Sequence, residues 1–368
     1  VWIPKPGKSE KRPLGIPTIS DRIVQECIRH VLEPIAEGQF FEHSYGFRPM
    51  RSADMAVARI KRLNFTAKCY WVVEGDIKGF FDNIDHNVMI ESLWQIGIRD
   101  KRILSIIKQM LKAGVMDECE TSELGTPQGG IISPLLANIY LNRFDRFITG
   151  DFERKKLRRT YSRSDGRLQA MRKHSKLKTA YYVRYADDWV ILTDNKEDAE
   201  RLKYKAKRYL RDTLKLELSE EKTLITNVTS RPIKFLGVEI KMDVRNGRMV
   251  NKVSPDMVRF DRKMKELSRE LFMLRKTATW DTERLIQNIT RVNSIIVGLM
   301  NYYSMCDQIS VVVRKYAWLL KYTAYKSLKR YGGKWIRANQ VSNLIGLHSG
   351  HLAHIPAISY KGMYIGIT

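Results

Sequence analysis

The chain has 368 residues, enough for a large core and roughly two or three subdomains, and 65 Lys and Arg against 40 Asp and Glu give a formal net charge of +25. That excess predicts a polyanionic partner: nucleic acid ahead of an anionic membrane surface, since no basic amphipathic anchor is evident. The sequence has no run of 18 apolar residues, which excludes an ordinary membrane span, and its four scattered cysteines are typical of reduced thiols in an intracellular protein.

The first twenty residues predict a basic hairpin. Two short β-like segments joined by a Pro/Gly turn would present Lys5 and Arg12, side chains that make charge-assisted contacts to phosphate. A generic basic loop is the alternative. Because the chain begins at Val1 inside this motif, we expect the natural protein to start further upstream. Apolar residues at helical spacing then predict a helix over 21–37.

An apolar strand over 70–77 ends in Asp76, and the Gly-rich segment 125–130 precedes a strongly patterned helix. Small residues at Gly129 and Gly130 would let a ligand approach the backbone closely, and Gln128 offers an amide for hydrogen bonds; a plain helix-entry loop is the alternative.

Residues 151–178 form the most polar segment of the chain. Eleven Lys and Arg face three Asp and Glu, and apolar periodicity is weak, which predicts an insertion that is partly disordered when free. A charge run can be merely solvated, but this one would make a strong phosphate-binding surface.

Two aromatic and β-branched runs over 181–192 flank Ala186-Asp187-Asp188, which predicts a β-hairpin with acids at its turn. Adjacent carboxylates repel each other, and a bound metal cation is their natural compensation, although a solvated turn is the alternative. Two-metal phosphoryl transfer uses carboxylates from separate strands to hold cations about 3.5–4 Å apart, and Asp76 with Asp187 and Asp188 would supply them.

A polar turn at 243–247 predicts a boundary. Beyond it, apolar residues step by three and four along two segments, and a third segment, aromatic and basic, runs from Val311 to Tyr331. Residues 336–368 hold three histidines without accompanying cysteines or acids, so we predict no zinc site there.

Six blocks follow one another in the sequence: RPLGIPT (12–18), SYGFRP (44–49), GDIKGFFD (75–82), GTPQGG (125–130), YADD (185–188) and FLG (235–237). Their order resembles that of group II intron-encoded reverse transcriptases, or maturases, of bacterial or organellar type. The resemblance implies an α/β right-hand polymerase: fingers and palm with an antiparallel sheet over 1–242, an α-helical thumb (domain X) over 243–335, and a C-terminal segment 336–368 of undefined role.

The resemblance also implies residue roles. Asp76, Asp187 and Asp188 would be the catalytic ligands of two Mg²⁺ ions. Phe81, five residues beyond the first acid, would block a ribose 2′-hydroxyl; an ordinary core Phe is the alternative. The residues implied to bind nucleotide are Lys5, Arg12, Phe81, Gln128, Gly129 and Lys222. Lys222 would protonate the departing pyrophosphate; an ordinary surface lysine is the alternative. The residues implied to bind nucleic acid are Arg48, Arg158, Arg159, Arg172, Lys173, Lys326 and Lys329. Phe47, which precedes Arg48, is expected in the core.

These observations predict a group II intron-encoded RNA-directed DNA polymerase. It would use an RNA template, a DNA primer, dNTPs and Mg²⁺, and would bind intron RNA to assist splicing and mobility, in bacterial cytoplasm or in an organelle and away from membranes. One rival is a catalytically weak splicing maturase that acts mainly by binding RNA, disfavoured because all three acids are present. Another is a bacterial defence reverse transcriptase, disfavoured by the basic insertion and the thumb-like region.

Overall fold

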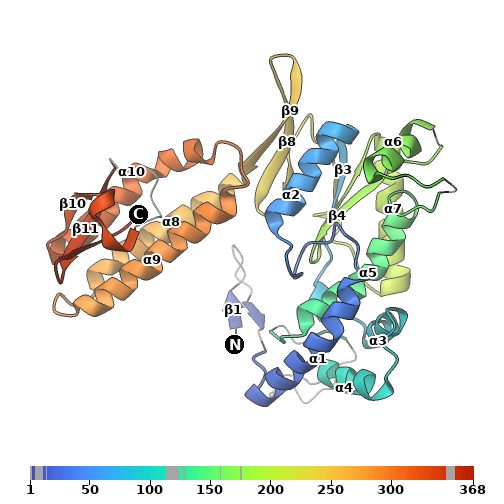
Figure 1. Cartoon of the computed structure of the whole chain (residues 1–368), viewed down its shortest axis with the longest axis horizontal. Helices are drawn as coiled ribbons and strands as arrows, with labels where there is room; N and C mark the ends of the chain where they lie inside the picture. Colours follow the sequence, from blue (N-terminus) through green and yellow to red (C-terminus); the bar gives the residue numbers. More distant parts are fainter. Residues whose placement is uncertain are drawn as a thin grey trace. The chain divides into compact units, whose positions relative to one another are not determined.

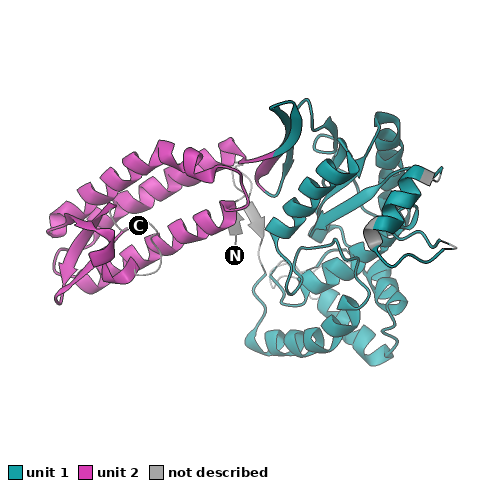
Figure 2. Ribbon diagram, turned by 45° about the horizontal axis from the view of Figure 1, so that its top comes forward, with its two compact units in different colours: residues 1–236, 240–251 teal, residues 237–239, 252–368 magenta. Residues whose placement is uncertain are grey.

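The structure is a computed structural model that describes residues 2–4, 11–13, 15–112, 124–126, 129–157, 159–174, 176–344 and 353–368. The chain divides into two compact units (Figure 2): unit 1 comprises Val1–Leu236 and Ile240–Asn251, and unit 2 comprises Gly237–Glu239 and Lys252–Thr368. No helix in the described part of the chain is long and apolar enough to cross a membrane.

Unit 1 is built on a four-stranded antiparallel sheet with strand order β4-β5-β3-β6 (Figure 1). The strands are β3 (Trp71–Gly75), β4 (Tyr181–Tyr185), β5 (Asp188–Thr193) and β6 (Leu224–Asn227). Their aromatic and β-branched residues pack well on a pleated surface, and Val72 and Val73 of the central strand are fully buried. The predicted strands at 70–77 and 181–192 are therefore confirmed.

Helices cover this sheet: α2, α5 and α7 all contact its strands. The helices of unit 1 are α1 (Ile19–Glu37), α2 (Ala53–Arg62), α3 (His86–Gln95), α4 (Lys101–Lys112), α5 (Ser133–Gly150), α6 (Ser164–His174) and α7 (Lys196–Leu214), with short turns at η1 (Leu63–Ala67) and η2 (Phe80–Asp82). Helix α1 confirms the helix predicted over 21–37, and it begins two residues earlier because the Thr18 hydroxyl accepts a hydrogen bond from the Asp21 N–H. Strands β1 (Trp2–Pro4) and β2 (Lys11–Pro13) pair antiparallel, as the predicted hairpin requires.

The basic segment 151–178 differs from its prediction. It contains helix α6 and is anchored at its start, where Phe152 and Glu153 are buried. The Glu153 carboxylate accepts a hydrogen bond from the Tyr182 N–H of β4 at 2.9 Å and pairs with Arg59 of α2 at 3.0 Å. These contacts join residues that are distant in sequence. Apolar periodicity reports only on local structure, so it could not predict them.

Unit 2 has three long helices: α8 (Met257–Met273), α9 (Thr282–Tyr303) and α10 (Ile309–Leu328). Short turns follow at η3 (Leu274–Lys276), η4 (Lys329–Tyr331), η5 (Ala338–Gln340) and η6 (Ser342–Leu344). A second sheet, ordered β10-β11-β12, is made by Lys334–Arg337, His354–Tyr360 and Met363–Gly366. Ile358 and Ile365 of this sheet pack in one core with Leu285 and Ile289, so the C-terminal segment completes the core of unit 2.

A third sheet, ordered β7-β8-β9, holds the point at which the chain passes between the two units. Its strands are β7 (Ile233–Phe235), β8 (Val238–Arg245) and β9 (Arg248–Pro255). The division runs through β8 and β9, and the chain stays in unit 2 from Lys252 onwards, whereas the sequence predicted a single boundary at 242–243.

Candidate active site

Two acidic motifs that are far apart in sequence lie at the same end of two neighbouring strands of the first sheet. In the antiparallel pair of β3 and β5, Gly75 lies opposite Trp189. Asp76 directly follows the last residue of β3, and Asp188 is the first residue of β5, so both acids lie at the same end of neighbouring strands. Residues directly opposite each other on such strands have Cβ atoms about 4.5–5.5 Å apart. The register therefore brings the predicted carboxylates together.

The third acid lies in the tight turn between β4 and β5. Tyr185 pairs with Asp188, which leaves Ala186 and Asp187 as a two-residue loop. Ala186 has φ +55°, in the left-handed region that two-residue hairpin turns use to match the strand twist. Asp187 is half-buried and Asp188 is exposed. The prediction of a hairpin with acids at its turn is confirmed.

A buried arginine supports this turn from inside. The Arg184 guanidinium donates to both carboxylate oxygens of Asp145 at 2.7 Å, to Asn138 Oδ1 at 3.0 Å and to the Ala186 carbonyl at 2.8 Å. Neither member of the Arg184–Asp145 pair has any exposed side-chain surface. Burial lowers the pKa of Arg184, but the Asp145 carboxylate outweighs this effect and the pKa is raised. The cation is thus fully paired, and one of its bonds fixes the backbone between the acids and β4.

Two glycines let the chain pack closely around the acids. A Cβ on Gly46 would lie 2.2 Å from the Ala186 nitrogen, and one on Gly75 would lie 2.1 Å from Trp189 Cζ2. The carbonyl of Gly46 also accepts a hydrogen bond from Asn138 Nδ2 at 2.8 Å. No side chain fits at either position without moving backbone or a buried indole. Sequence reasoning missed the supporting roles of Gly46, Asn138 and Arg184; the glycines inside the SYGFRP and GD motifs were the available signal.

A lysine lies against the first acid. Lys222 Nζ is 2.8 Å from Asp76 Oδ2, and the Asp76 side chain is 26% exposed. The backbone carbonyl of Asp76 accepts a hydrogen bond from the Ser219 N–H at 2.9 Å, which holds the Lys222 segment beside the end of β3. The structure thus pairs Lys222 with Asp76, at the strand end where Asp188 of the neighbouring strand also lies.

The donor set at this edge suits a hard divalent cation. Carboxylate oxygens are the ligands such ions prefer, and the ammonium of Lys222 shows that Asp76 accepts a positive charge there. Within the described ranges, no three His, Cys, Asp or Glu side chains are already gathered as a ligand set. Holding an ion with all three acids therefore requires their carboxylates to come closer together than they lie in this structure.

Phe81 lies in the short turn η2 beyond Asp76. Its neighbour Phe80 is buried, with 3% of its surface exposed, whereas Phe81 is half-buried. The core role considered for this Phe pair therefore falls to Phe80. The carbonyl of Phe81 accepts a hydrogen bond from the Thr126 N–H at 2.8 Å, so part of the Gly-rich segment lies directly against it. Gly129 is exposed with φ +110°, while Gln128 lies outside the described residues.

Two expectations for the SYGFRP block are wrong. The Arg48 side chain is only 4% exposed, because its guanidinium pairs with Glu37 and donates to the carbonyls of Phe41 and Ser44. With its N–H groups committed to the protein, it holds the turn together and does not offer itself to phosphate. Phe47, expected in the core, is instead 52% exposed at φ +58°.

The remaining predicted residues belong to other elements. Arg159 and Lys173 are exposed and Arg172 is half-buried, all three in the basic segment. Lys326 and Lys329 are exposed in unit 2. Arg12 lies in β2 opposite Ile3. Lys5 and Arg158 lie outside the described residues.

Comparison with known proteins gives the family. Residues 3–240 match the model of the family described as reverse transcriptase (RNA-dependent DNA polymerase). The chain is 34% identical to the group II intron-encoded protein LtrA of Lactococcus lactis subsp. cremoris over a 386-residue alignment, which covers 89% of this chain and 64% of that protein. It is 38% identical to protein YkfC of Escherichia coli over 250 residues, which cover 64% of this chain and 65% of that protein.

Among solved structures, apo telomerase from Candida tropicalis matches 83% of this chain and 55% of that chain, with 14% identity and a TM-score of 0.46. The chain spans a little under two thirds of the length of both curated relatives. The family match confirms the right-hand polymerase class, and the alignment with LtrA confirms the resemblance to group II intron-encoded proteins. Since the matched region is more than half of the chain, this protein belongs to the reverse transcriptase family.

Proposed function

We propose that this chain is an RNA-directed DNA polymerase that extends a DNA primer along an RNA template by two-metal nucleotidyl transfer. The observation that supports the proposal is the β3–β5 register: its last pair is Gly75 with Trp189, and Asp76 and Asp188 are the residues next to that pair at the same end of the two strands. Three carboxylates on adjacent strand ends are the ligand arrangement that this chemistry needs.

Asp76, Asp187 and Asp188 would hold two Mg²⁺ ions. When bound, such ions supply activation of the primer 3′-hydroxyl and neutralisation of the leaving pyrophosphate. The chain's own residues do the rest: Arg184 fixes the backbone of the acidic turn, and Phe81 presents an aromatic edge that excludes the ribose 2′-hydroxyl. Lys222 offers its ammonium to the departing phosphates once Asp76 turns away. Lys5, Arg12, Gln128 and Gly129 complete the proposed nucleotide site.

A second proposed role is binding of group II intron RNA, which would assist splicing and mobility. It is supported by the similarity to a group II intron-encoded protein and by the exposed cations outside the acidic site. The proposed RNA contacts are Arg158, Arg159, Arg172, Lys173, Lys326 and Lys329. The relatives named above are bacterial, so bacterial cytoplasm is the proposed compartment, with an organelle as the alternative.

Primer extension on an RNA template tests the polymerase proposal. The double substitution Asp187→Asn with Asp188→Asn should lower extension by roughly 10³-fold or more, because metal ligation contributes several kcal/mol to the transition state. Extension by the wild type should also require added Mg²⁺. RNA binding should survive, since no phosphate-binding cation is lost.

The matched control is Asp151→Asn with Asp212→Asn, which removes two acidic charges from exposed ion pairs of the same unit. It should leave extension within about 2-fold of wild type, as exposed pairs contribute little. Near-wild-type extension by the Asp187/Asp188 variant would refute the assignment of the site.

A further inference from the structure

One face of α10 exposes aromatic rings and cations at four-residue steps. Arg314, Trp318, Tyr322, Lys326 and Arg330 are all exposed, and Trp318 is 73% exposed. Residues four apart are neighbours on a helix surface, so the first four form a line along α10, and Arg330 follows them in the turn η4; we call these five residues the α10 stripe. The rings of Trp318 and Tyr322 stack with centroids 5.2 Å apart and planes 8° apart, and Lys326 Nζ lies 4.8 Å from the Tyr322 ring centre.

A groove of about 590 Å³ lies beside the stripe, between α8 and α10. Tyr322 and Lys326 line one side, and Phe272 and Arg275 line the other. Phe272 is 50% exposed, with the Arg275 guanidinium 4.8 Å from its ring centre. Arg275 Nε donates to Ser327 Oγ at 3.3 Å, which ties the two sides together. With Arg269, which also lines it, the groove therefore offers two aromatic rings and three cations.

The charge around the stripe has one sign. From Gln308 to the last residue the sequence contains no Asp or Glu, and its Lys and Arg are Arg314, Lys315, Lys321, Lys326, Lys329, Arg330, Lys334, Arg337 and Lys361. The acids of α8 have partners of their own: Asp261 accepts from Tyr316, Glu266 from Lys263 and Glu270 from Arg291. Large rings exposed among unopposed cations suit a polyanion that carries flat apolar groups.

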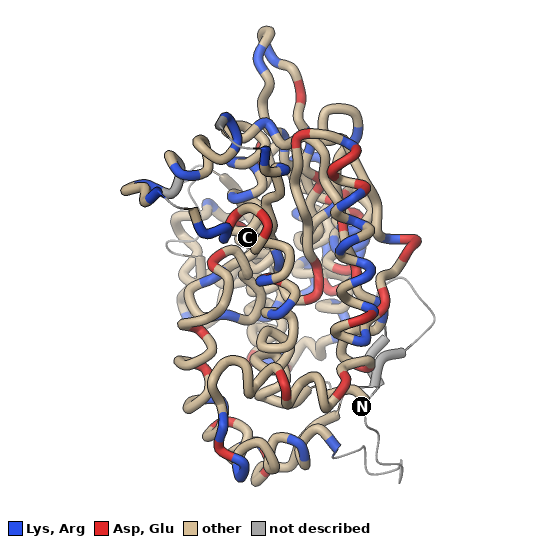
Figure 3. The backbone as a smooth tube through the Cα atoms, turned by 90° about the vertical axis from the view of Figure 1, so that its right-hand side faces the viewer, with Lys and Arg blue, Asp and Glu red and all other residues tan. Residues whose placement is uncertain are grey.

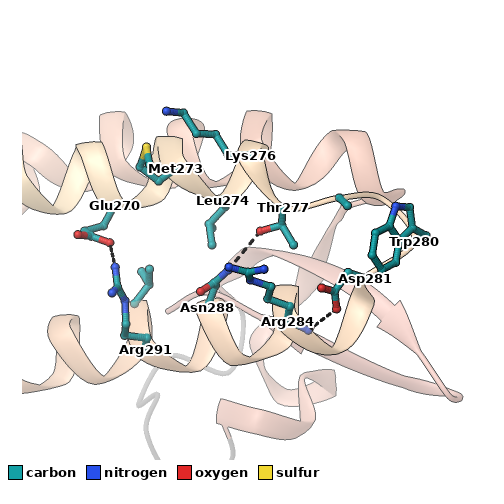
Figure 4. A pocket seen from close by; sticks show the side chains of 12 residues that line it. Glu270, Met273, Leu274, Lys276, Thr277, Trp280, Asp281, Arg284, Asn288 and Arg291 are labelled. Carbon is teal, nitrogen blue, oxygen red and sulfur yellow. Dashed lines mark hydrogen bonds and ion pairs between the residues drawn. The ribbon is translucent and has the colours of Figure 1, made fainter.

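The other strongly exposed tryptophan of unit 2 has a different setting. Trp280 is 85% exposed and lies at a groove of about 370 Å³ between α8 and α9 (Figure 4). Asp281 and Glu270 also line that groove, and Glu270 is paired with Arg291. Its two carboxylates offset two of its three cations, Lys276, Arg284 and Arg291, whereas the groove beside the stripe is lined by three cations and no acid, so the second groove serves as the control.

We propose that the α10 stripe and its groove bind unpaired nucleotides of RNA. Bases would stack on Trp318 and enter the groove lined by Phe272 and Tyr322, while Arg314, Lys326 and Arg330 contact the phosphates. The proposal rests on the proposed function in taking RNA as the partner. It goes further by assigning recognition to base stacking, which paired bases cannot offer because they are already stacked on one another.

Binding of a fluorescently labelled 12-nucleotide RNA to the full chain tests this, with the same RNA annealed as a blunt duplex for comparison. Trp318→Ala with Tyr322→Ala should weaken binding of the single strand about 10- to 100-fold and leave duplex binding within about 2-fold. Trp318→Phe with Tyr322→Phe should restore most of the affinity, because both keep a ring. Lys326→Gln should instead lower the slope of log affinity against log salt by about 0.7, the loss of one phosphate contact.

Trp280→Ala is the matched control and should change neither the single-strand nor the duplex affinity. Circular dichroism melting of each variant reports on folding. Photocrosslinking of a 5-iodouridine RNA to wild type should label the peptide that contains Trp318 or Tyr322. Unchanged single-strand affinity without the two rings, an equal loss for strand and duplex, or crosslinks only outside α8 and α10 would each overturn the proposal. Primer extension by wild type is measured separately: its absence would count against the polymerase proposal and would leave the binding result standing.

Discussion

Arg184 is the residue on which the geometry of the acidic turn depends most directly. It reaches two side chains of α5 and the carbonyl of Ala186, so a single guanidinium joins a helix, a strand and a turn. A lysine could carry the charge but not the planar fork that meets these acceptors simultaneously. The side chain does not touch the reacting groups; it positions those that do.

Arg184→Lys should therefore destabilise unit 1 by about 3–5 kcal/mol, the usual result of breaking a buried pair, and slow extension in the fraction that remains folded. Urea denaturation and single-turnover extension measure the two effects. Arg143→Lys, which alters a more exposed pair between α5 and Glu91, should cost less than about 1 kcal/mol. An Arg184→Lys protein as stable and as active as wild type would show that the turn needs no such support.

Phe81 is the second residue with a separable role. Replacing it by Ala would remove the ring that we propose excludes the ribose 2′-hydroxyl, while leaving the buried Phe80 in place. Phe81→Ala should improve incorporation of ribonucleotides relative to deoxyribonucleotides by at least about 10-fold, because exclusion by a ring is steric. Competition between the two nucleotide types in primer extension measures this. Phe80→Leu serves as the comparison: it should lower the stability of the protein and leave the choice between the two nucleotide types unchanged.

At the scale of elements, the basic segment depends on a buried carboxylate. Burial raises the pKa of Glu153 to about 7, although Arg59 and the Tyr182 N–H both lower it. A carboxylate whose folded pKa lies above its unfolded value of 4.5 binds more protons in the folded state. The free energy of unfolding therefore falls as pH rises from about 4.5 to about 7.

Glu153→Gln removes this titration. The stability of wild type relative to the variant should shrink by about 3 kcal/mol between pH 4.5 and pH 8, at about 1.4 kcal/mol per unit of pKa shift. Urea denaturation of both proteins across that range provides the measurement. His43 has the opposite effect on stability. Burial lowers its pKa from 6.5 to about 3, so its contribution to the free energy of unfolding rises as pH rises from about 3 to about 6.5. Only the difference between the two proteins isolates Glu153, and a pH-independent difference would contradict the assigned pKa.

The sequence predicted those elements whose signals are local. Strands β3, β4 and β5 carry aromatic and β-branched runs, and the acids sit at their ends. What it did not predict depends on partners far along the chain. Burial of Arg48 requires Glu37, and the role of Arg184 requires Asp145, 39 residues earlier. Helix α6 has one fully buried anchor, Met171, which is too little to show as periodicity.

At the scale of the whole molecule, each unit has a core of its own. The core of unit 2 is shared between its helices and the C-terminal strands, whose role the sequence did not indicate: Ile358 and Ile365 pack with residues of α8 and α9. The Asn293 side chain of α9 also donates to the Gly366 carbonyl at 2.8 Å and accepts from the Thr368 N–H at 3.1 Å. The last residues are thus structural parts of this unit.

Ile358→Ala with Ile365→Ala should destabilise unit 2 by about 2–5 kcal/mol per site, the usual range for truncating buried Ile. Limited proteolysis should then cut within 257–328 at lower urea concentration, while the sheet of unit 1 stays protected. Met363→Ala, at a 49% exposed position of the same strand β12, is the control. Equal sensitivity of the two variants would mean that the C-terminal strands do not hold the helices.

The strand order of the first sheet has a consequence for protein synthesis. Strand β3 is central, yet both of its neighbours, β5 and β6, are encoded long after it, and β6 ends at Asn227. At roughly 5–20 residues per second, β3 waits on the order of 10 to 30 seconds before both of its edges are paired. Open edges of an apolar strand are templates for aggregation. A ribosome that stalls before Asn227 therefore exposes a nascent chain with an unprotected strand, and chaperones would be needed most during that interval.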